Sequence, residues 1–360
     1  MNPTPPASAE LDAAITLLTT PPPTVELETV RAIAHSHYDW DAVCTPMAGE
    51  RDRNFLLARS DAAPVTLKFI NASESPQETD LQVQVLAHLE RQDLPIQTPQ
   101  PLTTLDGQAS FHLETAGGPL RGRAYTYLQG TPAVHTPGSA RHRTSVGKMV
   151  AQLDRALHGF QHPAKTRIFL WDLMHVPHLA AFSQHVGDPR LRHFIADFLD
   201  HFARCTLAAV SGLPHQFIHA DLSKSNLLVD PADPEIVVGV LDFGDMVYAP
   251  RIADLAIAAS YQMGNAGDPM AALEQVVQGF QSESPLLPQE REHLLDFVMA
   301  RLVQRLVITE WRAARFPENR EYILRSNPEA QSLLHALMPI WRSDSQRRLA
   351  PTGLERKTAP

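Results

Sequence analysis

Apolar residues follow two different periods on either side of Gly130. Before it, short apolar runs predominate, and Val65, Leu67 and Phe69 alternate with polar residues as in a half-buried strand. After it, longer segments repeat their apolar residues every three or four positions, which is typical of amphipathic helices. The pattern therefore predicts a small lobe rich in strands, followed by a larger and mainly helical lobe.

The individual elements follow from the same periodicities. In the small lobe we expect helices at residues 26–40 and 76–90, and strands at 55–58, 65–70, 111–113 and 123–128, of which the first two form a hairpin. In the large lobe we expect helices at 141–157, 192–207 and 288–315, and a short β insert at 217–219, 227–229 and 236–242. The chain thus divides into a Pro-rich arm (1–24) with a short helix at 11–18, a small lobe (25–129), a large lobe (130–348) and a tail (349–360). A ligand cleft is expected between the lobes.

Composition narrows the classes of function. The 360 residues carry a formal net charge of −9, which argues against binding nucleic acid or an anionic membrane through bulk charge. Neither the two cysteines, Cys44 and Cys205, nor the 17 scattered histidines show the spacing of a metal site. The sequence has no apolar run as long as a membrane span and no signal-peptide pattern, so we expect a cytoplasmic protein. Nothing in it indicates an oligomeric state.

The strongest chemical signal lies in the β insert. Its first strand is followed by His219 and Asp221, and Asn226 comes five residues after that aspartate. A second apolar run ends at Asp242, which a Phe-Gly pair follows. This spacing can hold a base, a metal-binding amide and a metal-binding carboxylate around one γ-phosphate.

In this hypothesis Asp221 orients an acceptor hydroxyl and takes its proton late in phosphoryl transfer. Asn226 and Asp242 supply oxygen ligands for Mg²⁺, and His219 supports the loop by hydrogen bonding. The alternative is that these residues are loop caps and satisfied polar groups, since the spacing by itself is only moderately specific. The two strands that precede the segments favour the catalytic interpretation.

Lys68 lies in the middle of a strand, between Leu67 and Phe69. It either contacts the α- and β-phosphates of a nucleotide or discourages aggregation as an edge-strand lysine. The other motifs favour the phosphate contact. Such a lysine usually pairs with a glutamate on the neighbouring helix, and the candidates are Glu78 and Gln82, one turn apart. Gln82 can form only a hydrogen bond, so Glu78 is weakly preferred.

The nucleotide has further candidate contacts in the small lobe. Arg51 and Arg53 precede the first strand of the predicted hairpin, where a loop that covers phosphates is expected, although Gly49 is its only glycine. The alternative for the two arginines is a solvated charge cluster. Tyr127 ends the last strand of the lobe, and its segment either presents backbone groups to a purine or is plain strand.

Four residues of the large lobe are candidates for supporting or substrate-side roles. Asp254 starts an Ala-rich helix and either accepts hydrogen bonds from the catalytic-loop backbone or is an ordinary first-turn aspartate. Asp245 either meets a substrate ammonium or caps a turn. Trp171 and Asp172 form a possible substrate-side pair, although a tryptophan in the core is the commoner case.

Together these segments resemble a known family. The chain is similar to the aminoglycoside phosphotransferase/choline kinase family of protein-kinase-like folds, and within it to hydroxylysine kinases and to the phosphotransferase domain fused to some class III aminotransferases. The likeness extends from about residue 25 to about residue 337. It rests on the segments 49–55 (GERDRNF), 65–68 (VTLK), 153–160 (LDRALHGF), 171–173 (WDL), 219–226 (HADLSKSN) and 239–245 (GVLDFGD).

The resemblance implies an α+β, bilobal protein-kinase-like fold with a small antiparallel sheet and one helix in the first lobe and a mainly helical second lobe. It implies transfer of the γ-phosphoryl group of ATP or GTP, with Mg²⁺, to a hydroxyl of a small amino acid or amino alcohol. The family's base, metal ligands and phosphate lysine match Asp221, Asn226 with Asp242, and Lys68. Ala220 is a departure, because the family usually has glycine there, and we expect its methyl group to be tolerated at a negative φ.

Lys224 and Ser225 are further departures, at positions that often carry Asn and Tyr in the family. They leave the acceptor open: an aminoglycoside, homoserine or choline are alternatives to hydroxylysine, because acceptor specificity lies in the variable helical lobe. A nucleotide-binding pseudokinase is an alternative of another class. The missing glycine loop leaves that alternative open, whereas the complete set of catalytic residues argues against it.

Overall fold

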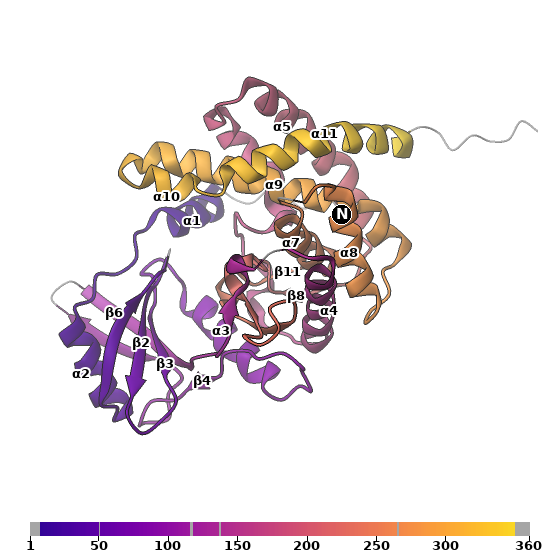
Figure 1. Cartoon of the computed structure of the whole chain (residues 1–360). Helices are drawn as coiled ribbons and strands as arrows, with labels where there is room; N and C mark the ends of the chain where they lie inside the picture. The colour runs from indigo at the N-terminus through magenta and orange to yellow at the C-terminus, as the bar shows by residue number, and fades with distance from the viewer. Residues whose placement is uncertain (1–7, 50, 116–117, 137, 265, 350–360) are drawn as a thin grey trace, which may run out of the picture.

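Two lobes stand side by side in the computed structural model of the chain, which describes residues 8–49, 51–115, 118–136, 138–264 and 266–349 (Figure 1). The small lobe is built on one sheet, and the large lobe consists mainly of helices. The predicted α+β bilobal architecture is confirmed.

The small lobe contains an antiparallel sheet. Its strands are β1 (Ala42–Met47), β2 (Arg53–Arg59), β3 (Val65–Phe69), β4 (Pro101–Leu102), β5 (Phe111–Thr115) and β6 (Gly118–Thr126). They are ordered β1-β2-β3-β6-β4, and β5 pairs with β6. β2 and β3 form the predicted hairpin. Strand β1 was not predicted. Its apolar residues do not share one buried face, since Cys44 is buried whereas Val43 is 70% exposed.

One face of this sheet forms the core of the small lobe. Val65, Leu67 and Phe69 are at most 2% exposed and pack with Phe55 and with helix α2 (Leu27–Tyr38). Successive side chains of a strand point to opposite faces, so Lys68 lies on the other face. There it pairs in register with Asn54 of β2 and Arg123 of β6.

Helix α3 (Pro76–Leu89) covers that second face. Ser75 and Glu78 form a capping box at its N-terminus, in which each side chain accepts a hydrogen bond from the other residue's backbone N–H. Its buried residues Leu81, Val85 and Leu86 belong to the core of the large lobe. The helix therefore connects the two lobes.

The large lobe is organised around the 28-residue helix α9. Its other helices are α4 (Ala140–Leu157), α5 (Pro189–His201), α6 (Leu207–Val210), α7 (Ile252–Gln262), α8 (Pro269–Gln281), α10 (Arg320–Leu324) and α11 (Asn327–Leu349), and α9 itself is Pro288–Arg315. α9 packs against α7, α10, α11 and the 3₁₀ segment η3 (Leu173–His185). The helix predicted at residues 192–207 is interrupted by a π-helical turn, Phe202–Thr206, between α5 and α6.

Two small sheets carry the predicted β insert. Strand β8 (His215–Ile218) pairs with β11 (Val247–Pro250), and β9 (Leu227–Val229) lies between β7 (Thr131–Pro132) and β10 (Val237–Val240). All of these pairings are antiparallel. The loops that follow β8 and β10 carry the residues singled out from the sequence.

Part of the predicted N-terminal arm is packed on the protein. Helix α1 (Ser8–Thr19) lies beside α10 in Figure 1, and its Leu17 and Leu18 are buried in the core of the large lobe. The Asn71 side chain donates hydrogen bonds to the carbonyl oxygens of Thr20 and Pro21 at 3.1 and 3.2 Å. The helix predicted at 11–18 is thus present, while residues 1–7 of the arm and 350–360 of the tail lie outside the described residues.

Across the described ranges, every helix is too short or too polar to cross a bilayer.

Candidate active site

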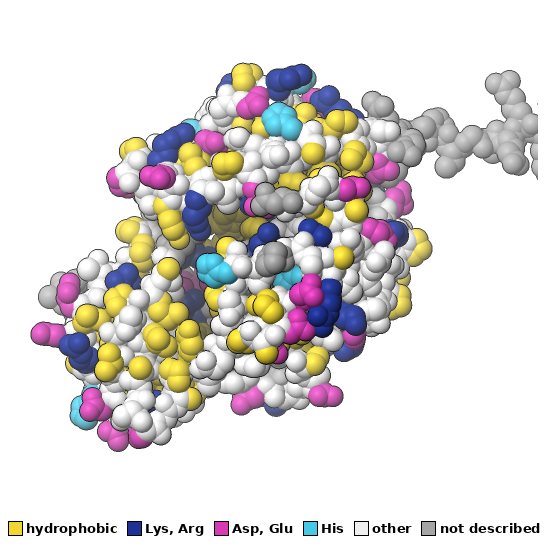
Figure 2. Space-filling model, in the orientation of Figure 1, with side chains coloured by type: hydrophobic (Ala, Val, Ile, Leu, Met, Phe, Trp, Pro, Cys, Tyr) yellow, Lys and Arg dark blue, Asp and Glu magenta, His cyan; other side chains and the backbone are white. Residues whose placement is uncertain are grey.

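A cavity of about 410 Å³ separates the two lobes. Lys68 and Asp52 line it from the small lobe, and Asp221, Asp242 and Arg301 line it from the large lobe. Figure 2 shows it as a hollow with both basic and acidic side chains in its depth. Lys68, Asp221 and Asp242, which were predicted to act on a phosphoryl group, therefore meet in one space, whereas Asn226 and His219 are not among the residues that line it.

The loop after β8 is anchored by a buried carboxylate. Asp254, in the first turn of α7, accepts hydrogen bonds from the backbone N–H groups of His219 and Ala220, both at 2.7 Å. These are the hydrogen bonds expected of Asp254. The His219 ring accepts a bond from the Asp221 N–H at Nδ1 (3.2 Å), so its Nε2–H donates to the carbonyl oxygen of Leu241 at 2.9 Å. His219 thus connects the two loops, as predicted.

Ala220 adopts an unusual backbone conformation in this loop. Its φ is +63°, so the condition under which its methyl group is tolerated without strain is not met. A residue with a Cβ is destabilised by about 1–2 kcal/mol in the left-handed region. Hydrogen bonds hold the peptide groups on both sides of the Ala220 Cα, because the Ala220 N–H donates to Asp254 and the Asp221 N–H donates to His219 Nδ1.

Asp221 emerges from this loop into the cavity with both carboxylate oxygens engaged. Oδ1 accepts a hydrogen bond from Arg301 Nη2 at 2.7 Å, and Oδ2 accepts one from the Asn226 amide at 2.7 Å. Burial raises the pKa of Asp221 to about 6, with Asp245 and Asp242 adding to the rise and the Arg301 charge opposing it. A carboxylate with this pKa is mostly ionised at neutral pH and still a competent proton acceptor.

Asp242 has the opposite electrostatic environment. Its backbone is left-handed (φ +59°), and its carboxylate accepts a hydrogen bond from the Gly244 N–H at 3.3 Å. The ammonium of Lys68 lies 3.5 Å away and lowers the pKa of Asp242 to about 2. With this pKa the carboxylate is ionised at neutral pH. The side chain is 54% exposed and lines the cavity.

The partner of Lys68 is not the one predicted. Its ammonium lies 2.9 Å from Asp52, which is 7% exposed, and neither Glu78 nor Gln82 pairs with it. Glu78 caps α3 and forms an ion pair with Arg167 at 2.6 Å. Those two predicted contacts are therefore wrong.

The physical reason is a second buried cation beside Lys68. The Arg123 guanidinium is fully buried and donates to the carbonyl oxygen of Thr79 at 3.1 Å and to the side-chain oxygen of Gln82. It thus lies between α3 and the sheet. The pairing of the hairpin indicates Asp52 as a partner. Asn54 lies opposite Lys68, and Asp52, two residues before Asn54, points to the same face of the sheet.

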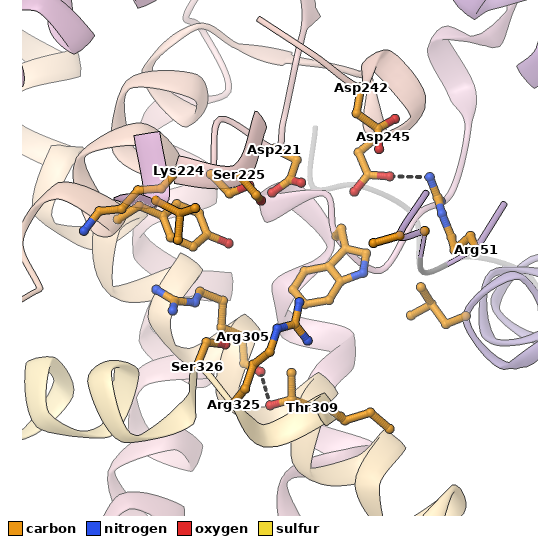
Figure 3. A pocket seen from close by; sticks show the side chains of 18 of the residues that line it. Arg51, Asp221, Lys224, Ser225, Asp242, Asp245, Arg305, Thr309, Arg325 and Ser326 are labelled. Atoms are coloured by element: carbon orange, nitrogen blue, oxygen red, sulfur yellow. Dashed lines mark hydrogen bonds and ion pairs between the residues drawn. The ribbon is translucent and has the colours of Figure 1, made fainter. Parts of the chain in front are cut away.

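Arg51 crosses the cleft. Its Nη2 donates to Asp245 Oδ1 at 2.6 Å, and this ion pair joins the loop before β2 to the segment after β10, as Figure 3 shows. A Cβ at Gly49 would lie 2.4 Å from the Asp52 carbonyl oxygen, so the loop requires glycine there. Arg53 lies in β2 over the Phe55 ring and is not among the residues that line the cavity. Glu50 lies outside the described residues.

The remaining candidates divide between the cavity and the protein body. Trp171 lines the cavity, and its ring lies 5.0 Å from the Arg301 guanidinium. Asp172 does not line it: it is 4% exposed and caps η3 by accepting a hydrogen bond from the Met174 N–H, so its predicted substrate contact was wrong. Tyr127 is 36% exposed and lies outside the cavity lining, and its contact with a purine stays a prediction.

The oxygen groups present suit a hard divalent ion that shares its ligands with a substrate. Asn226 donates from its Nδ2 to Asp221, which leaves the amide oxygen available, and the Asp242 carboxylate faces the cavity. Across the described residues, no group of three or more His, Cys, Asp or Glu side chains could enclose a metal by itself. Mg²⁺ is commonly bound in proteins through one or two carboxylates together with phosphate oxygens.

Sequence reasoning missed the arginines of α9. Arg301 and Arg305 are one turn apart, only 2% and 3% exposed, and both line the cavity. The signal was available, because two arginines at i and i+4 in a largely apolar helix place two charges on one buried face. Only the fold shows that this face reaches Asp221.

Comparison with known proteins agrees with this geometry. A profile of the phosphotransferase enzyme family matches residues 43–293. The chain belongs to this family. Hydroxylysine kinase of Danio rerio is 31% identical over 322 residues, covering 85% of this chain and 89% of that protein. Hydroxylysine kinase of Mus musculus is 29% identical, covering 78% and 80%. The chain is therefore a small-molecule phosphotransferase that acts on an alcohol group.

Solved structures share the fold at lower identity. A microcompartment-associated aminopropanol kinase superposes with a TM-score of 0.70 at 20% identity, covering 88% of this chain and 98% of that one. Amicoumacin kinase in complex with AMP-PNP and Ca²⁺ gives a TM-score of 0.63 at 14% identity, covering 88% and 96%. At these identities the likeness establishes the protein-kinase-like fold.

The ion pair between Arg301 and Asp221 predicts a shift in the pH profile of activity. The Arg301 charge favours the ionised carboxylate, so Arg301→Gln raises the pKa of Asp221, and activity is lost at a higher pH on acidification. Arg301→Lys keeps the charge and moves the acid limb less. The measurement is kcat/KM against pH for the three proteins with one nucleotide and one metal. Coincident acid limbs in wild type and Arg301→Gln would contradict the assignment.

The ion pair between Lys68 and Asp52 predicts a defect in nucleotide binding. Asp52→Asn keeps the size of the side chain and an oxygen for the Asn71 N–H, but it removes the nearer counter-charge of Lys68. We expect the KM for the nucleotide to rise on the order of 10-fold. Glu78→Gln is the matched control, since it weakens the contact with Arg167 and leaves Lys68 paired. A larger effect of Glu78→Gln on this KM would reverse the assignment.

Proposed function

We propose that the enzyme transfers the γ-phosphoryl group of ATP or GTP to the hydroxyl of an amino acid or amino alcohol, with 5-hydroxylysine as the leading acceptor. The observation that carries the reaction is Asp221, held by Arg301 and Asn226 and facing the same cavity as Lys68 and Asp242. The choice of acceptor is supported by the hydroxylysine kinases to which the chain is about 30% identical over most of its length.

Asp221 acts as the base in this proposal. Two donors fix its carboxylate, so one lone pair of an oxygen can be aimed at the acceptor hydroxyl without rotation of the side chain. The proton moves from the hydroxyl to Asp221 as the hydroxyl oxygen bonds to the γ-phosphorus, while the bond from that phosphorus to the β-phosphate oxygen breaks and ADP or GDP leaves. A pKa of about 6 suits Asp221 to this step, because it is ionised before the transfer and protonated after it.

The nucleotide phosphates occupy the opposite wall. Lys68 contacts them once they draw its ammonium from Asp52 and Asp242, and Arg51 covers them from the loop before β2. Asn226 and Asp242 would hold Mg²⁺, which supplies positive charge to the phosphate oxygens. Solved relatives were crystallised with AMP-PNP or with GDP, so both ATP and GTP are candidate donors.

Phosphate transfer to defined acceptors tests this proposal. With γ-labelled ATP and GTP we expect label on 5-hydroxylysine in a panel that also holds homoserine, 1-aminopropan-2-ol, choline and kanamycin. Asp221→Asn is expected to lower kcat on the order of 10²- to 10⁴-fold, because the base is lost while the shape of the side chain is kept. Affinity for the Mg-nucleotide, measured by calorimetry, should change little.

Two outcomes would contradict the proposal. Turnover of a folded Asp221→Asn variant at the wild-type rate would remove Asp221 as the base. Transfer to kanamycin or choline with greater efficiency than to hydroxylysine would replace the acceptor class while leaving the reaction in place.

A further inference from the structure

The wall of the cavity below Asp221 carries the guanidinium groups of Arg305 and Arg325. Arg305 is 3% exposed, and its Nη1 is buried with no hydrogen-bond partner among the described residues. Its guanidinium lies over the Tyr261 ring, 4.4 Å from the centroid. A buried guanidinium without an anionic partner is unfavourable, so the site is built for a ligand that supplies one.

Arg325 extends the same wall. It follows α10, lines the cavity, and donates from Nη1 to the Tyr322 carbonyl oxygen at 2.7 Å. In Figure 3 the guanidinium groups of Arg305 and Arg325 both point into the cavity, with Thr309 and Ser326 at their base. Neither arginine takes part in an ion pair within the described part of the chain.

Two further charged side chains line this wall. One is Arg312, whose pKa is lowered by burial and by the neighbouring Arg325. The carboxylate of Glu329 borders the same space, and its Oε1 has no partner among the residues described. A group with an anion and an adjacent cation, such as an α-amino-acid head, matches this wall.

The wall lies on the acceptor side of the base. In Figure 3, Asp242 and Asp245 lie on one side of Asp221, and Arg305 and Arg325 lie on the other. Lys68 and Arg51, the proposed phosphate contacts, pair with Asp242 and Asp245 on the first side. Arg305 is four residues, about 6 Å along the helix axis, from the Arg301 that holds Asp221. An anion bound here therefore belongs to the molecule whose hydroxyl meets Asp221.

We propose that Arg305 and Arg325 form a subsite for the α-carboxylate of the acceptor, so that the enzyme selects free hydroxy-amino acids over amino alcohols and aminoglycosides. The inference rests on the proposed function and names the feature of the acceptor that it recognises. A planar guanidinium pairs with a carboxylate through two parallel hydrogen bonds. In 5-hydroxylysine the carboxylate is carbon 1 and the hydroxyl is on carbon 5, so an extended molecule connects the two groups of the site.

The test compares 5-hydroxylysine with its decarboxylated counterpart, 1,5-diaminopentan-2-ol. Wild type should prefer the amino acid in kcat/KM by at least about 100-fold. Arg305→Gln should lower kcat/KM for hydroxylysine on the order of 10- to 100-fold, mainly through KM, and change the value for the diamine less than about 3-fold. Arg325→Gln, an exposed site where folding is not at stake, should act in the same direction. Arg320→Gln, on α10 outside the cavity, is the matched control and should change neither.

The other results either overturn the proposal or separate it from the proposed function. If Arg305→Gln weakens Mg-nucleotide binding in calorimetry instead of raising the KM of hydroxylysine, the arginine binds a phosphate and not an acceptor carboxylate. Equal use of hydroxylysine and the diamine by wild type removes the carboxylate subsite while the kinase function stands. If no acceptor is phosphorylated, the proposed function fails, and calorimetry with hydroxylysine decides the subsite: binding that is lost in Arg305→Gln supports it, and absence of binding to wild type overturns it.

Discussion

The site depends on one buried carboxylate, that of Asp254. Its two oxygens hold the backbone N–H groups of His219 and Ala220, and so keep Ala220 at a positive φ that its methyl group disfavours. Only with this turn does the chain leave β8 with Asp221 directed into the cavity. Asp254 is completely buried, and its hydrogen bonds hold the loop in this conformation. Helix α7, which carries Asp254, packs against helix α9, which carries Arg301.

Two aspartates in one cavity acquire different chemistry from their surroundings. Burial raises the pKa of Asp221, whereas the Lys68 ammonium lowers the pKa of Asp242. One carboxylate can therefore take a proton near neutral pH while the other stays charged. The same Lys68 ammonium also pairs with Asp52, at 2.9 Å.

The sequence revealed those parts of the site whose evidence is local. Asp221, Asn226 and Asp242 were singled out because their spacing and the preceding strands lie within 26 residues, and Lys68 because it lies in the middle of a strand, between Leu67 and Phe69. The partner of Lys68 was predicted wrongly. Helical periodicity shows which side chains share a face of α3, but it does not show that the Arg123 guanidinium fills the space beneath this helix. Strand pairing within a short hairpin would have indicated Asp52.

The fold shows the same division between local and long-range information. The strongly periodic helices and the β2–β3 hairpin could be predicted, whereas β1 is mostly exposed and the sequence pattern that marks a strand is absent from it. The arginines of the proposed acceptor side could not be predicted, since they come from α9 and from the residue after α10. Arg301 of α9 contacts Asp221 from 80 residues away in the chain. Arg301 and Arg305 sit on one rigid helix, so the spacing between the base and the proposed carboxylate subsite is set by the helix itself. A loop-borne subsite would adapt to acceptors of several lengths. A subsite on α9 instead favours the acceptor whose hydroxyl and anion are separated by the distance that the helix imposes.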